Sequence, residues 1–376
     1  MTRTTIAVIG GGLAGLYTAR RLAAASIDFQ LFEARDRLGG RILSADGAGN
    51  PAADGFDLGP SWFWPRMQPQ LAALVSELGL ASFEQHSEGD VLFERMSREA
   101  VQRLRSIRQE PESMRLAGGT GALVAALAAG LQPERVHLQR RLTMVTLGPS
   151  SLELTLRGPE HTLERVRADQ LILAMPPRLI AATVSFTPAL AAPTLERWEA
   201  TATWMAPHAK FVAVYERPFW RERGLSGTAQ SMVGPLVEIH DATTHSHSAA
   251  LFGFLGVGPE QRAAAGEREL KQACITQLAR LFGDEAAKPR ATLLKDWTAD
   301  PLTSTPADRM GAGHPVATQT PWVTSPWAAR LSLGGSEASS TEPGYLAGAI
   351  EAAERAVADT ERRLSLETKG VPHAHQ

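Results

Sequence analysis

The segment from Thr5 to Glu33 constrains the fold of this chain more than any other part of the sequence. It begins with TTIAVIG, an apolar run rich in β-branched residues that predicts a buried strand. A glycine-rich turn, GGGLAGL, follows, and residues 16–24 have the pattern of a helix. The run IDFQLF predicts a second strand with Glu33 at its end. Strand, turn, helix and strand in this order predict a β-α-β unit.

The glycines of this turn have the spacing G-x-G-x-x-G, with Gly10, Gly12 and Gly15 at the fixed positions. The first makes a tight turn, the second lets the backbone approach a pyrophosphate, and the third lets the helix pack closely on the strand. The helix N-terminus offers N–H groups to the phosphates. Glu33 lies roughly 20 residues further on, where an acid can accept both ribose hydroxyls. We therefore expect a dinucleotide site; the alternative is a glycine-rich turn without a ligand.

Length and composition narrow the class of protein. A chain of 376 residues is too long for one ordinary core and suggests two interleaved domains. Hydrophobic residues make up 44% and charged residues 21%, as in a soluble globular enzyme. The net charge of −2 gives no basic surplus for binding nucleic acid or an anionic membrane. The single cysteine, Cys274, excludes an internal disulfide.

The sequence contains no pattern that predicts a membrane segment. The first predicted strand leaves no room for a signal peptide, and no apolar run reaches the roughly 20 residues that span a bilayer. The tail after Leu366 is short and polar. We expect a cytoplasmic protein without membrane contact.

The first half of the chain continues with turns and predicted helices. Gly39, Gly40 and Arg41 form a second glycine turn whose cation can meet a phosphate. Residues 56–65, FDLGPSWFWP, combine turn residues with aromatics. Residues 66–116 have a helical pattern that includes a charged stretch, RMSREAVQRLRSIRQE, expected to be a solvated helix face. LAGGTGALVAALAAGL then predicts a glycine turn and an apolar helix.

The remainder alternates between strands and helices. Short antiparallel strands are expected at ERVHLQ, LTMVTL, SLELTLRG and HTLERVRA, and a separate buried strand at LILAMPP. A proline-containing crossover spans 186–199. A second β region follows at AKFVAVYE, TAQSMVG, SAALFGFL and ATLLKDW, interrupted by one amphipathic helix that ends at Gly283. The last unit predicts a strand, a glycine turn and a long helix from about Pro343.

Three histidines, His240, His245 and His247, lie in the polar segment HDATTHSH, which resembles a loop between strands. A metal site needs fixed geometry and usually a further ligand. We therefore expect no metal there.

Five motifs in the same order resemble the flavin-containing amine oxidases, the family that includes monoamine oxidase and polyamine oxidase. GGGLAGL with Glu33, Arg35 and the GGR turn resembles its FAD fingerprint. FDLGPSW resembles a loop under the flavin, and AGGTGALVAAL through LILAMPPRLI with FTPAL resembles the middle of the family. MAPHAKFVAVYERPFW and GGSEASSTEPGYLAGAIEAAERAV resemble the segment of the active-site lysine and the C-terminal signature.

The resemblance implies an α/β fold in which a Rossmann-like FAD-binding domain is interleaved with a smaller α+β substrate domain. The expected FAD-binding domain comprises residues 1–64, 117–186 and 300–366. The substrate domain comprises 65–116 and 187–299, and residues 367–376 are expected to be a disordered tail.

The resemblance also implies which residues contact FAD, held without a covalent bond because no cysteine lies at the flavin end. Glu33 would bind the adenosine ribose, Arg41 the pyrophosphate and the backbone near Leu142 the adenine. Glu337 would lie near the ribityl chain, and the Leu346 N–H would face flavin O2, where a helix N-terminus stabilises negative charge. The full set is Gly10, Gly12, Leu13, Ala14, Gly15, Glu33, Ala34, Arg35, Gly39, Gly40, Arg41, Leu58, Gly59, Pro60, Ser61, Leu142, Gly335, Ser336, Glu337 and Leu346.

Lys210 aligns with the lysine that holds a water against flavin N5 in the family, and Trp297 matches a tryptophan near that lysine. On the predicted strand, His208, Lys210 and Val212 share one face. The alternative for Lys210 is a surface lysine on an edge strand. For Trp297 it is a core aromatic.

Tyr345 matches one wall of the two-ring aromatic cage of the family. The second ring normally follows the tryptophan, but the corresponding segment, TADPLTSTPADRM, has no aromatic residue. Half of the cage is therefore missing or comes from elsewhere, with Trp62 or Trp64 as candidates. Trp62, Trp64 and His208 are the expected substrate-pocket residues. The stretch between Pro65 and Leu116 is shorter than in the mitochondrial enzymes of the family, which indicates a shorter or more open substrate cavity.

The function implied by the resemblance is oxidation of a small-molecule amine by hydride transfer to FAD, with O2 reoxidising the flavin and releasing hydrogen peroxide. Lys210, Tyr345 and Trp297 are the expected catalytic residues of a monomer or homodimer. The alternatives are a related flavoenzyme that desaturates a carbon skeleton and a non-catalytic FAD-bound scaffold.

Overall fold

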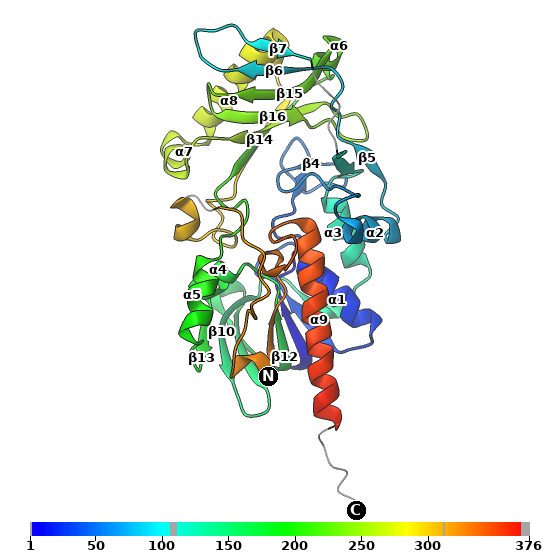
Figure 1. Cartoon of the computed structure of the whole chain (residues 1–376), viewed down its shortest axis with the longest axis vertical. Helices are drawn as coiled ribbons and strands as arrows, with labels where there is room; N and C mark the ends of the chain where they lie inside the picture. The colour runs from blue at the N-terminus through cyan, green and yellow to red at the C-terminus, as the bar shows by residue number, and fades with distance from the viewer. Residues whose placement is uncertain (1, 106–110, 311–312, 370–376) are drawn as a thin grey trace, which may run out of the picture. The chain divides into compact units, whose positions relative to one another are not determined.

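The computed structural model describes residues 2–105, 111–310 and 313–369 (Figure 1). The chain forms two compact units. The first unit contains Met1–Gly40, Val124–Trp204 and Pro301–Gln376, and the second contains Arg41–Leu123 and Met205–Asp300. The chain passes between them more than once, so each unit is assembled from segments distant in sequence.

The first unit is built on an eight-stranded mixed sheet in the order β13-β10-β11-β12-β1-β2-β9, with β19 also paired to β12. β12 runs parallel to β1 and β19, and β2 runs parallel to β1 and β9. β11 is antiparallel to both β10 and β12. The strands are β1 (Thr2–Ile9), β2 (Phe29–Phe32), β9 (Val136–His137), β10 (Arg141–Leu147), β11 (Leu152–Arg157), β12 (Leu163–Leu173), β13 (Ser185–Thr187) and β19 (Leu331–Leu333).

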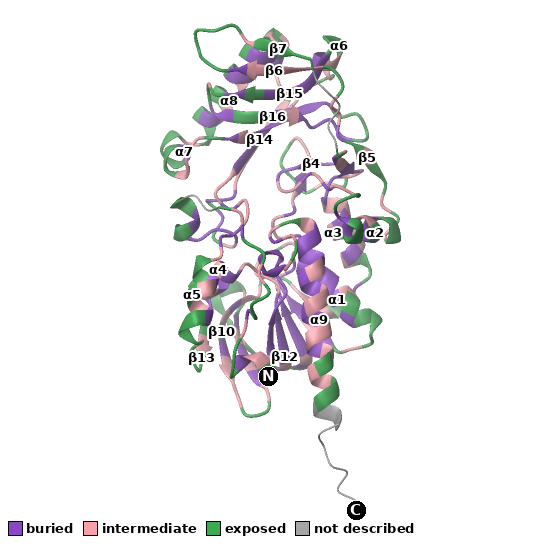
Figure 2. Ribbon diagram, in the orientation of Figure 1, coloured by how far each residue is buried: buried purple, intermediate pink, exposed green. Residues whose placement is uncertain are grey.

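β12 merges two strands that the sequence analysis separated. Its first half pairs with β11, and its second half pairs with β19. Burial alternates near Leu163 and becomes continuous toward Leu173 (Figure 2). The change of burial along one strand explains why the two halves have different sequence patterns.

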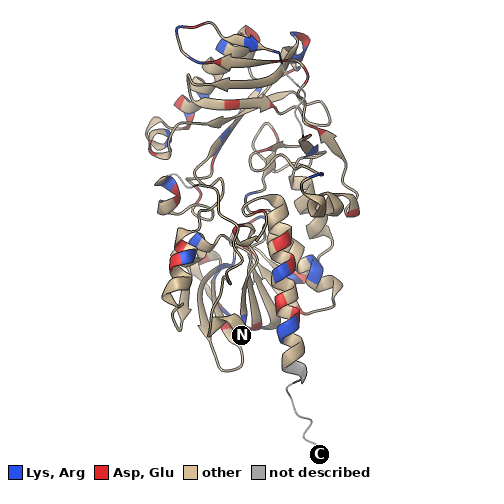
Figure 3. Cartoon of the chain, in the orientation of Figure 1, with Lys and Arg blue, Asp and Glu red and all other residues tan. Residues whose placement is uncertain are grey.

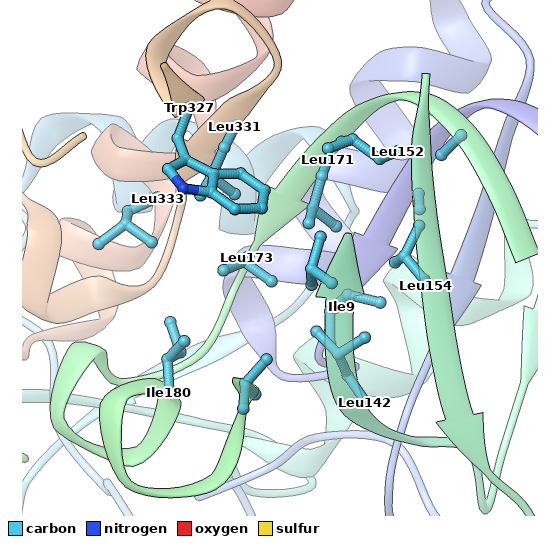
Figure 4. Packing of buried hydrophobic residues seen from close by; sticks show 14 of the residues in the cluster. Ile9, Leu142, Leu152, Leu154, Leu171, Leu173, Ile180, Trp327, Leu331 and Leu333 are labelled. Carbon is cyan, nitrogen blue, oxygen red and sulfur yellow. The ribbon is translucent and has the colours of Figure 1, made fainter. Parts of the chain in front are cut away.

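A large hydrophobic cluster of the first unit lies on one face of this sheet (Figure 4). Leucines of neighbouring strands pack there with Trp327 and with Ile180 from α4 (Pro177–Thr183). The side chains shown are fully or nearly fully buried, so their apolar area contributes strongly to stability. The labelled residues are Ile9, Leu142, Leu152, Leu154, Leu171, Leu173, Ile180, Trp327, Leu331 and Leu333.

Two helices of the first unit lie side by side: α1 (Leu13–Ala24) and α9 (Leu346–Lys369). The Tyr17 hydroxyl donates a hydrogen bond of 2.7 Å to Glu354 between them. The buried face of α9 carries small residues, including Ala352 and Ala356, which let it approach neighbouring chain closely. Its other positions carry many of the charges visible in Figure 3. The unit also contains α5 (Ala192–Ala200).

The second unit contains a seven-stranded sheet in the order β18-β14-β17-β16-β15-β6-β7. α8 (Glu267–Phe282) packs on one face through a stripe that includes Leu270, Cys274 and Leu278. A smaller apolar cluster covers the other face, with Val212, Phe252 and Leu58 among its members. The strands are β6 (Asp90–Glu94), β7 (Gln102–Leu104), β14 (Ala209–Val214), β15 (Leu225–Ser231), β16 (Leu236–Asp241), β17 (Ala250–Leu255) and β18 (Ala291–Asp296).

The rest of the second unit consists of short elements. They are β3 (Ser44–Ala45), β4 (Phe56–Asp57), α2 (Pro69–Glu77), β5 (Ser82–Glu84), β8 (Met114–Leu116), α3 (Gly121–Ala129), which continues into the first unit, α6 (Phe219–Glu222), α7 (Pro259–Ala265) and α8 (Glu267–Phe282). No helix in the described ranges is long and apolar enough to cross a bilayer.

The helical expectation for residues 66–116 is wrong except at α2. Four strands occupy the described remainder, and the charged stretch contributes β7 instead of a helix. β6 pairs with β7 on one side and β15 on the other, and Arg103 pairs with Asp90 across β6 and β7 at 2.5 Å. Sheet pairing therefore overrides local helix propensity here. Residues 106–110 lie outside the described residues.

Two of the predicted helices also differ from expectation. The single helix expected before Gly283 is two helices, α7 and α8, separated by Gly266 at φ +82°. Its predicted end is confirmed, because Gly283 has φ +94° and caps α8. α9 begins at Leu346 and runs to Lys369, so residues 367–369 of the expected disordered tail are helical. LSLETK has few helix breakers, which explains the extension. Residues 370–376 lie outside the described residues.

Candidate active site

The glycine turn after β1 has the geometry that its spacing predicts. Gly10 has φ +107°, and a Cβ there would lie 2.6 Å from the Ala174 carbonyl oxygen. A Cβ on Gly15 would lie 1.7 Å from the Gly10 oxygen, so only glycine lets α1 pack this closely on the turn. A Cβ on Gly12, by contrast, would come no closer than 3.8 Å to its nearest neighbour, Gly39 O. The first and third glycines are thus needed for packing, and the second leaves an approach to the backbone.

The N-terminus of α1 is suited to an anion. Gly12 is its N-cap, without a side-chain capping bond, and its first turn contains no acidic residue. The second glycine turn lies beside it, since the Gly39 N–H donates to Gly11 O at 2.8 Å. Gly12 and Gly39 also form an isolated parallel bridge. These backbone groups and the helix dipole can hold a pyrophosphate.

Glu33 is 6% exposed at the end of β2. Its carboxylate accepts the Gly11 N–H at 2.6 Å and the Arg35 N–H at 2.8 Å. The two bonds fix one carboxylate oxygen each, and each oxygen keeps a further lone pair. Ala34 follows directly, and the Arg35 guanidinium donates to Thr303 Oγ1 at 2.9 Å. Glu33 is therefore oriented and can accept hydroxyl groups of a ribose.

The GSE turn meets the glycine loop at the end of β12. A Cβ on Gly335 would lie 2.5 Å from Met175 O, next to the Ala174 oxygen that excludes a Cβ on Gly10. Glu337 is fully buried; it accepts the Ser336 hydroxyl at 2.9 Å and the Trp204 N–H at 3.2 Å. The structure thus brings together, within the first unit, two motifs that are far apart in sequence.

Two other predicted cofactor residues of the first unit, Leu142 and Leu346, lie where their backbone groups could contact FAD. Leu142 is on β10 with its side chain buried in the core, so only its backbone can meet a ligand. Leu346 is the first residue of α9, where the helix has N–H groups without intrahelical partners.

Lys210 lies in the second unit on β14, which is an interior strand between β17 and β18. Its side chain is 3% exposed, so the alternative of a surface lysine on an edge strand is wrong. The amine donates to Gly59 O at 3.2 Å and Ser61 Oγ at 2.7 Å. It also lies 4.0 Å from the centroid of the Phe252 ring. Burial lowers the pKa of Lys210 to about 7, with Asp57 raising it and Arg115 lowering it further.

The loop Leu58–Ser61 is held by its backbone oxygens. Trp297, which is 5% exposed, donates its indole N–H to Leu58 O at 2.9 Å. Lys210 donates to Gly59 O, and Thr120 Oγ1 lies 2.9 Å from Pro60 O. Trp297 and Lys210 therefore act on adjacent carbonyl groups of one loop.

The expected pocket residues of the second unit have different surroundings. The Trp62 ring lies 5.4 Å from Phe252 and 4.9 Å from His240, and its indole N–H donates to Gln85 at 2.8 Å. Trp62 thus extends the aromatic surface beneath the Lys210 amine. Trp64 lies in the turn before α2. His208 immediately precedes β14, and burial lowers its pKa.

Tyr345 lies in the first unit directly before α9 and is 37% exposed. The His314 and Trp204 rings lie 5.1 Å and 6.2 Å from it. Trp204 also packs on Gly344, where a Cβ would come within 2.6 Å of that side chain. Neither ring is in the segment that normally supplies the second cage wall, and the sequence analysis identified neither of them.

The three histidines of HDATTHSH do not converge. His240 is on β16 and bonds to Glu238 at 2.6 Å, whereas the ring of His245 lies 5.4 Å from that of Phe83. In the parts of the chain that the structure describes, no group of histidine, cysteine and acidic residues could hold a metal ion.

Sequence reasoning also missed the residues around Lys210. Phe252 and Phe254 both lie within 6 Å of its amine, measured to the ring centroids, and their spacing of two on a strand could have placed them on one face. Asp57 was visible within FDLGPSW, but nothing in the sequence showed that it is buried. Thr120 and Arg115 gave no signal, because their contacts are made by long-range packing.

Comparison with known proteins gives consistent relatives. The family described as flavin containing amine oxidoreductase matches residues 13–106 and 95–360. A putrescine oxidase of Kocuria rosea is 25% identical over 79% of this chain and 83% of its own. An L-amino acid dehydrogenase of Synechocystis is 26% identical over 66% of this chain and 51% of its own.

Solved structures show the same fold. A putrescine oxidase with bound putrescine superposes with a TM-score of 0.78 at 21% identity, covering 96% of this chain and 99% of the other. The cyclohexylamine oxidase from Brevibacterium oxydans IH-35A gives 0.78 at 20% identity with the same coverage. The predicted α/β fold of FAD-dependent amine oxidases is thereby confirmed. Because the family match covers most of the sequence, this chain belongs to the flavin-containing amine oxidoreductases, FAD-dependent enzymes that oxidise amines.

Proposed function

We propose that this protein is an oxidase of a small, largely apolar amine. When bound, FAD supplies a two-electron oxidation of the C–N bond, with dioxygen as final acceptor. Water hydrolyses the imine, so amine, oxygen and water give a carbonyl compound, ammonia or a smaller amine, and hydrogen peroxide. The redox chemistry belongs to the cofactor, and the protein contributes binding, orientation and electrostatics.

The residues of the first unit fit a bound FAD. Gly12 and the α1 N-terminus would hold the pyrophosphate, together with Arg41 at the start of the next segment. Glu33 would bind the adenosine ribose through its remaining lone pairs, and the N-terminus of α9 would favour negative charge on the reduced flavin. The observation that supports this assignment is the tight glycine geometry around Gly10 and Gly15.

Lys210 is the observation that carries the catalytic proposal. A lysine is rarely this buried without a purpose, because removing its charge from water is costly. Lys210 is held by two oxygens and an aromatic face, without an acidic residue among its hydrogen-bond partners in the described chain. We propose that it holds a water at the flavin and stabilises the charge that develops when dioxygen is reduced. This role favours an enzyme over a non-catalytic scaffold.

The substrate class follows from two arguments. Relatives named for putrescine and cyclohexylamine suggest small alkyl amines. The aromatic rings beside the Lys210 amine favour a neutral amine over its ammonium form, because apolar surroundings disfavour a charged group. We further propose that the protein is cytoplasmic and works as a monomer or homodimer.

The test is peroxide release by the purified yellow protein. Alkyl amines, diamines, aromatic amines and amino acids are offered in turn, and small alkyl amines or diamines should give the highest kcat/KM. If an amine bleaches the flavin in air but no peroxide forms, an acceptor other than dioxygen reoxidises the flavin. Failure of every amine to reduce the flavin would refute the proposed function.

The cofactor should be held without a covalent bond, because the only cysteine, Cys274, lies on the buried face of α8 in the core of the second unit. Acid precipitation should leave the yellow colour in the supernatant. Colour that stays with the pellet would show a covalent link.

A further inference from the structure

Gly59, Ser61 and Phe252 surround the Lys210 amine and form what we call the lysine cradle. Among the described residues, two charged side chains near this cradle are buried without an ion-pair partner. Asp57 is 4% exposed and Arg115 is 5% exposed. Within the described residues, Asp57 Oδ2 and Arg115 Nε have no hydrogen-bond partner, and neither side chain forms an ion pair. Because burying an unpaired charge is costly, this arrangement calls for a function that offsets the cost.

Asp57 organises the loop that binds the Lys210 amine. Its Oδ1 accepts the Ser44 hydroxyl at 2.6 Å, the Thr120 N–H at 2.8 Å and lies 2.9 Å from Thr120 Oγ1. That same hydroxyl lies 2.9 Å from Pro60 O. Pro60 stands between Gly59 and Ser61, the two residues to which Lys210 donates. Asp57 is thus linked to Lys210 through the Thr120 side chain and the loop Leu58–Ser61.

Arg115, on β8, is held by backbone oxygens. Its guanidinium donates to Thr243 O at 2.9 Å and Ala242 O at 3.2 Å, and lies 5.2 Å from the centroid of the Phe83 ring. Carbonyl dipoles orient this cation but do not neutralise it. Its positive charge therefore acts on its surroundings through a low-dielectric interior.

The two charges affect Lys210 in opposite directions. Burial is the main cause of its lowered pKa; the Asp57 carboxylate raises that pKa, and the Arg115 cation lowers it. Other charged groups near β14 have partners of their own. Lys295, opposite Lys210 on β18, pairs with Asp300, and His240 on β16 pairs with Glu238.

Among the residues that the structure describes, the remaining neighbours of Lys210 offer no further charge on its face. His208 precedes it on the chain, and burial lowers the pKa of its imidazole, which favours the neutral ring. β17 presents the rings of Phe252 and Phe254. Asp57 and Arg115 are therefore the charges that act on the ionisation of Lys210, in addition to its burial.

We propose that Asp57 and Arg115 are positioning residues that set, with opposite signs, how readily Lys210 releases its proton. Burial brings Lys210 near the balance between amine and ammonium at neutral pH, and the two buried charges shift this balance in opposite directions. In this state a modest change of field, such as a charge arising beside it, moves the proton on or off. The importance of this balance for turnover rests on the proposed function, but its existence does not.

The test measures the ionisation of Lys210 directly in the FAD-loaded full chain. The sequence contains only five lysines, so their Cε carbons can be labelled with ¹³C and followed by NMR across a pH titration. The Lys210 signal is assigned by its absence in Lys210→Met. Asp57→Asn should lower its midpoint and Arg115→Met should raise it, each by roughly tenfold in proton affinity, or about 1.4 kcal/mol.

Matched variants separate electrostatics from damage to the fold. Asp300→Asn removes a buried carboxylate that pairs with Lys295, so it should move the Lys295 signal and leave that of Lys210 in place. Arg115→Lys keeps the charge and should stay near the wild-type midpoint. If Arg115→Met does not fold, the isosteric Asp57→Asn decides alone. An unchanged Lys210 midpoint in Asp57→Asn, or shifts of the same sign in both variants, would overturn the proposal.

The result is independent of amine turnover. Shifts of opposite sign in a protein that oxidises no amine would support the charge balance and refute the proposed function. Peroxide formation with an unmoved midpoint would do the reverse. A purely structural role for Asp57 would lower the melting temperature of Asp57→Asn without moving the Lys210 midpoint.

Discussion

The dinucleotide cradle of the first unit and the lysine cradle of the second differ in how they are built. Around Gly10, Gly12 and Gly15, backbone groups make the site, and neighbouring backbone excludes a side chain at Gly10 and Gly15. Around Lys210, side chains make most of the site, and they come from β14, β17, the residue after β18 and the loop Leu58–Ser61, which also supplies the Gly59 carbonyl. A backbone site tolerates almost no added atom, whereas a side-chain site can lose one group and remain folded.

The contrast predicts its largest effect at Gly15. In Gly15→Ala the new methyl group would lie 1.7 Å from the Gly10 oxygen, so α1 must move away from the turn. We expect loss of FAD from the purified protein and a lower melting temperature. Gly130→Ala is the control, because its Cβ would meet only Leu127 O at 3.7 Å. Retention of full FAD content by Gly15→Ala would show that the turn is more adaptable than its geometry indicates.

Glu33 should have the next largest effect, because it is the one side chain on which the backbone site depends. Glu33→Ala removes the acceptor of the Gly11 N–H and the proposed acceptor of the ribose hydroxyls. Each lost charge-assisted bond should cost about 1.5–3 kcal/mol, or roughly 10-fold to 100-fold in the FAD dissociation constant. Fluorescence titration of apoprotein measures this constant. Glu33→Gln keeps the size of the side chain and one oxygen, so its FAD dissociation constant should lie between those of the wild type and Glu33→Ala.

The same contrast explains what could be predicted from sequence. The β-α-β unit is local: strand, glycines, helix and Glu33 lie within one short segment, so their spacing is enough to predict their geometry. Lys210 was predicted only through the family resemblance, and its partners Ser61 and Phe252 come from segments that alternation patterns cannot bring together. At β7 the sequence pattern predicts a helix, but the segment forms a strand because it pairs with β6. Local geometry was therefore predictable, and tertiary partners were not.

Lys210→Met tests whether the lysine cradle is needed for chemistry but not for cofactor binding. The substitution keeps an apolar stem and removes the charge. We expect a folded, yellow protein whose reduced flavin reacts with oxygen at least about tenfold more slowly, equivalent to ~1.4 kcal/mol of barrier. Stopped-flow mixing of anaerobically reduced protein with oxygenated buffer measures the rate. Reoxidation at the wild-type rate would remove Lys210 from the oxygen step, and normal reduction by amine as well would leave it a structural role.

The last expected effect is on stability, and it distinguishes the two sites by pH. Because burial lowers the pKa of Lys210 to about 7, the folded protein binds fewer protons there than the unfolded chain above that pH. The stability contributed by this group therefore rises with pH from about 7 towards the pKa of an exposed lysine, by roughly 1 kcal/mol for each pH unit. Lys210→Met lacks this dependence, so its free energy of unfolding should exceed that of the wild type most below pH 7, and the difference should shrink as the pH rises. Denaturant titrations of FAD-loaded protein at several pH values measure this difference. A constant difference would mean that Lys210 keeps an ordinary pKa in the folded protein, and that its burial does not set its charge.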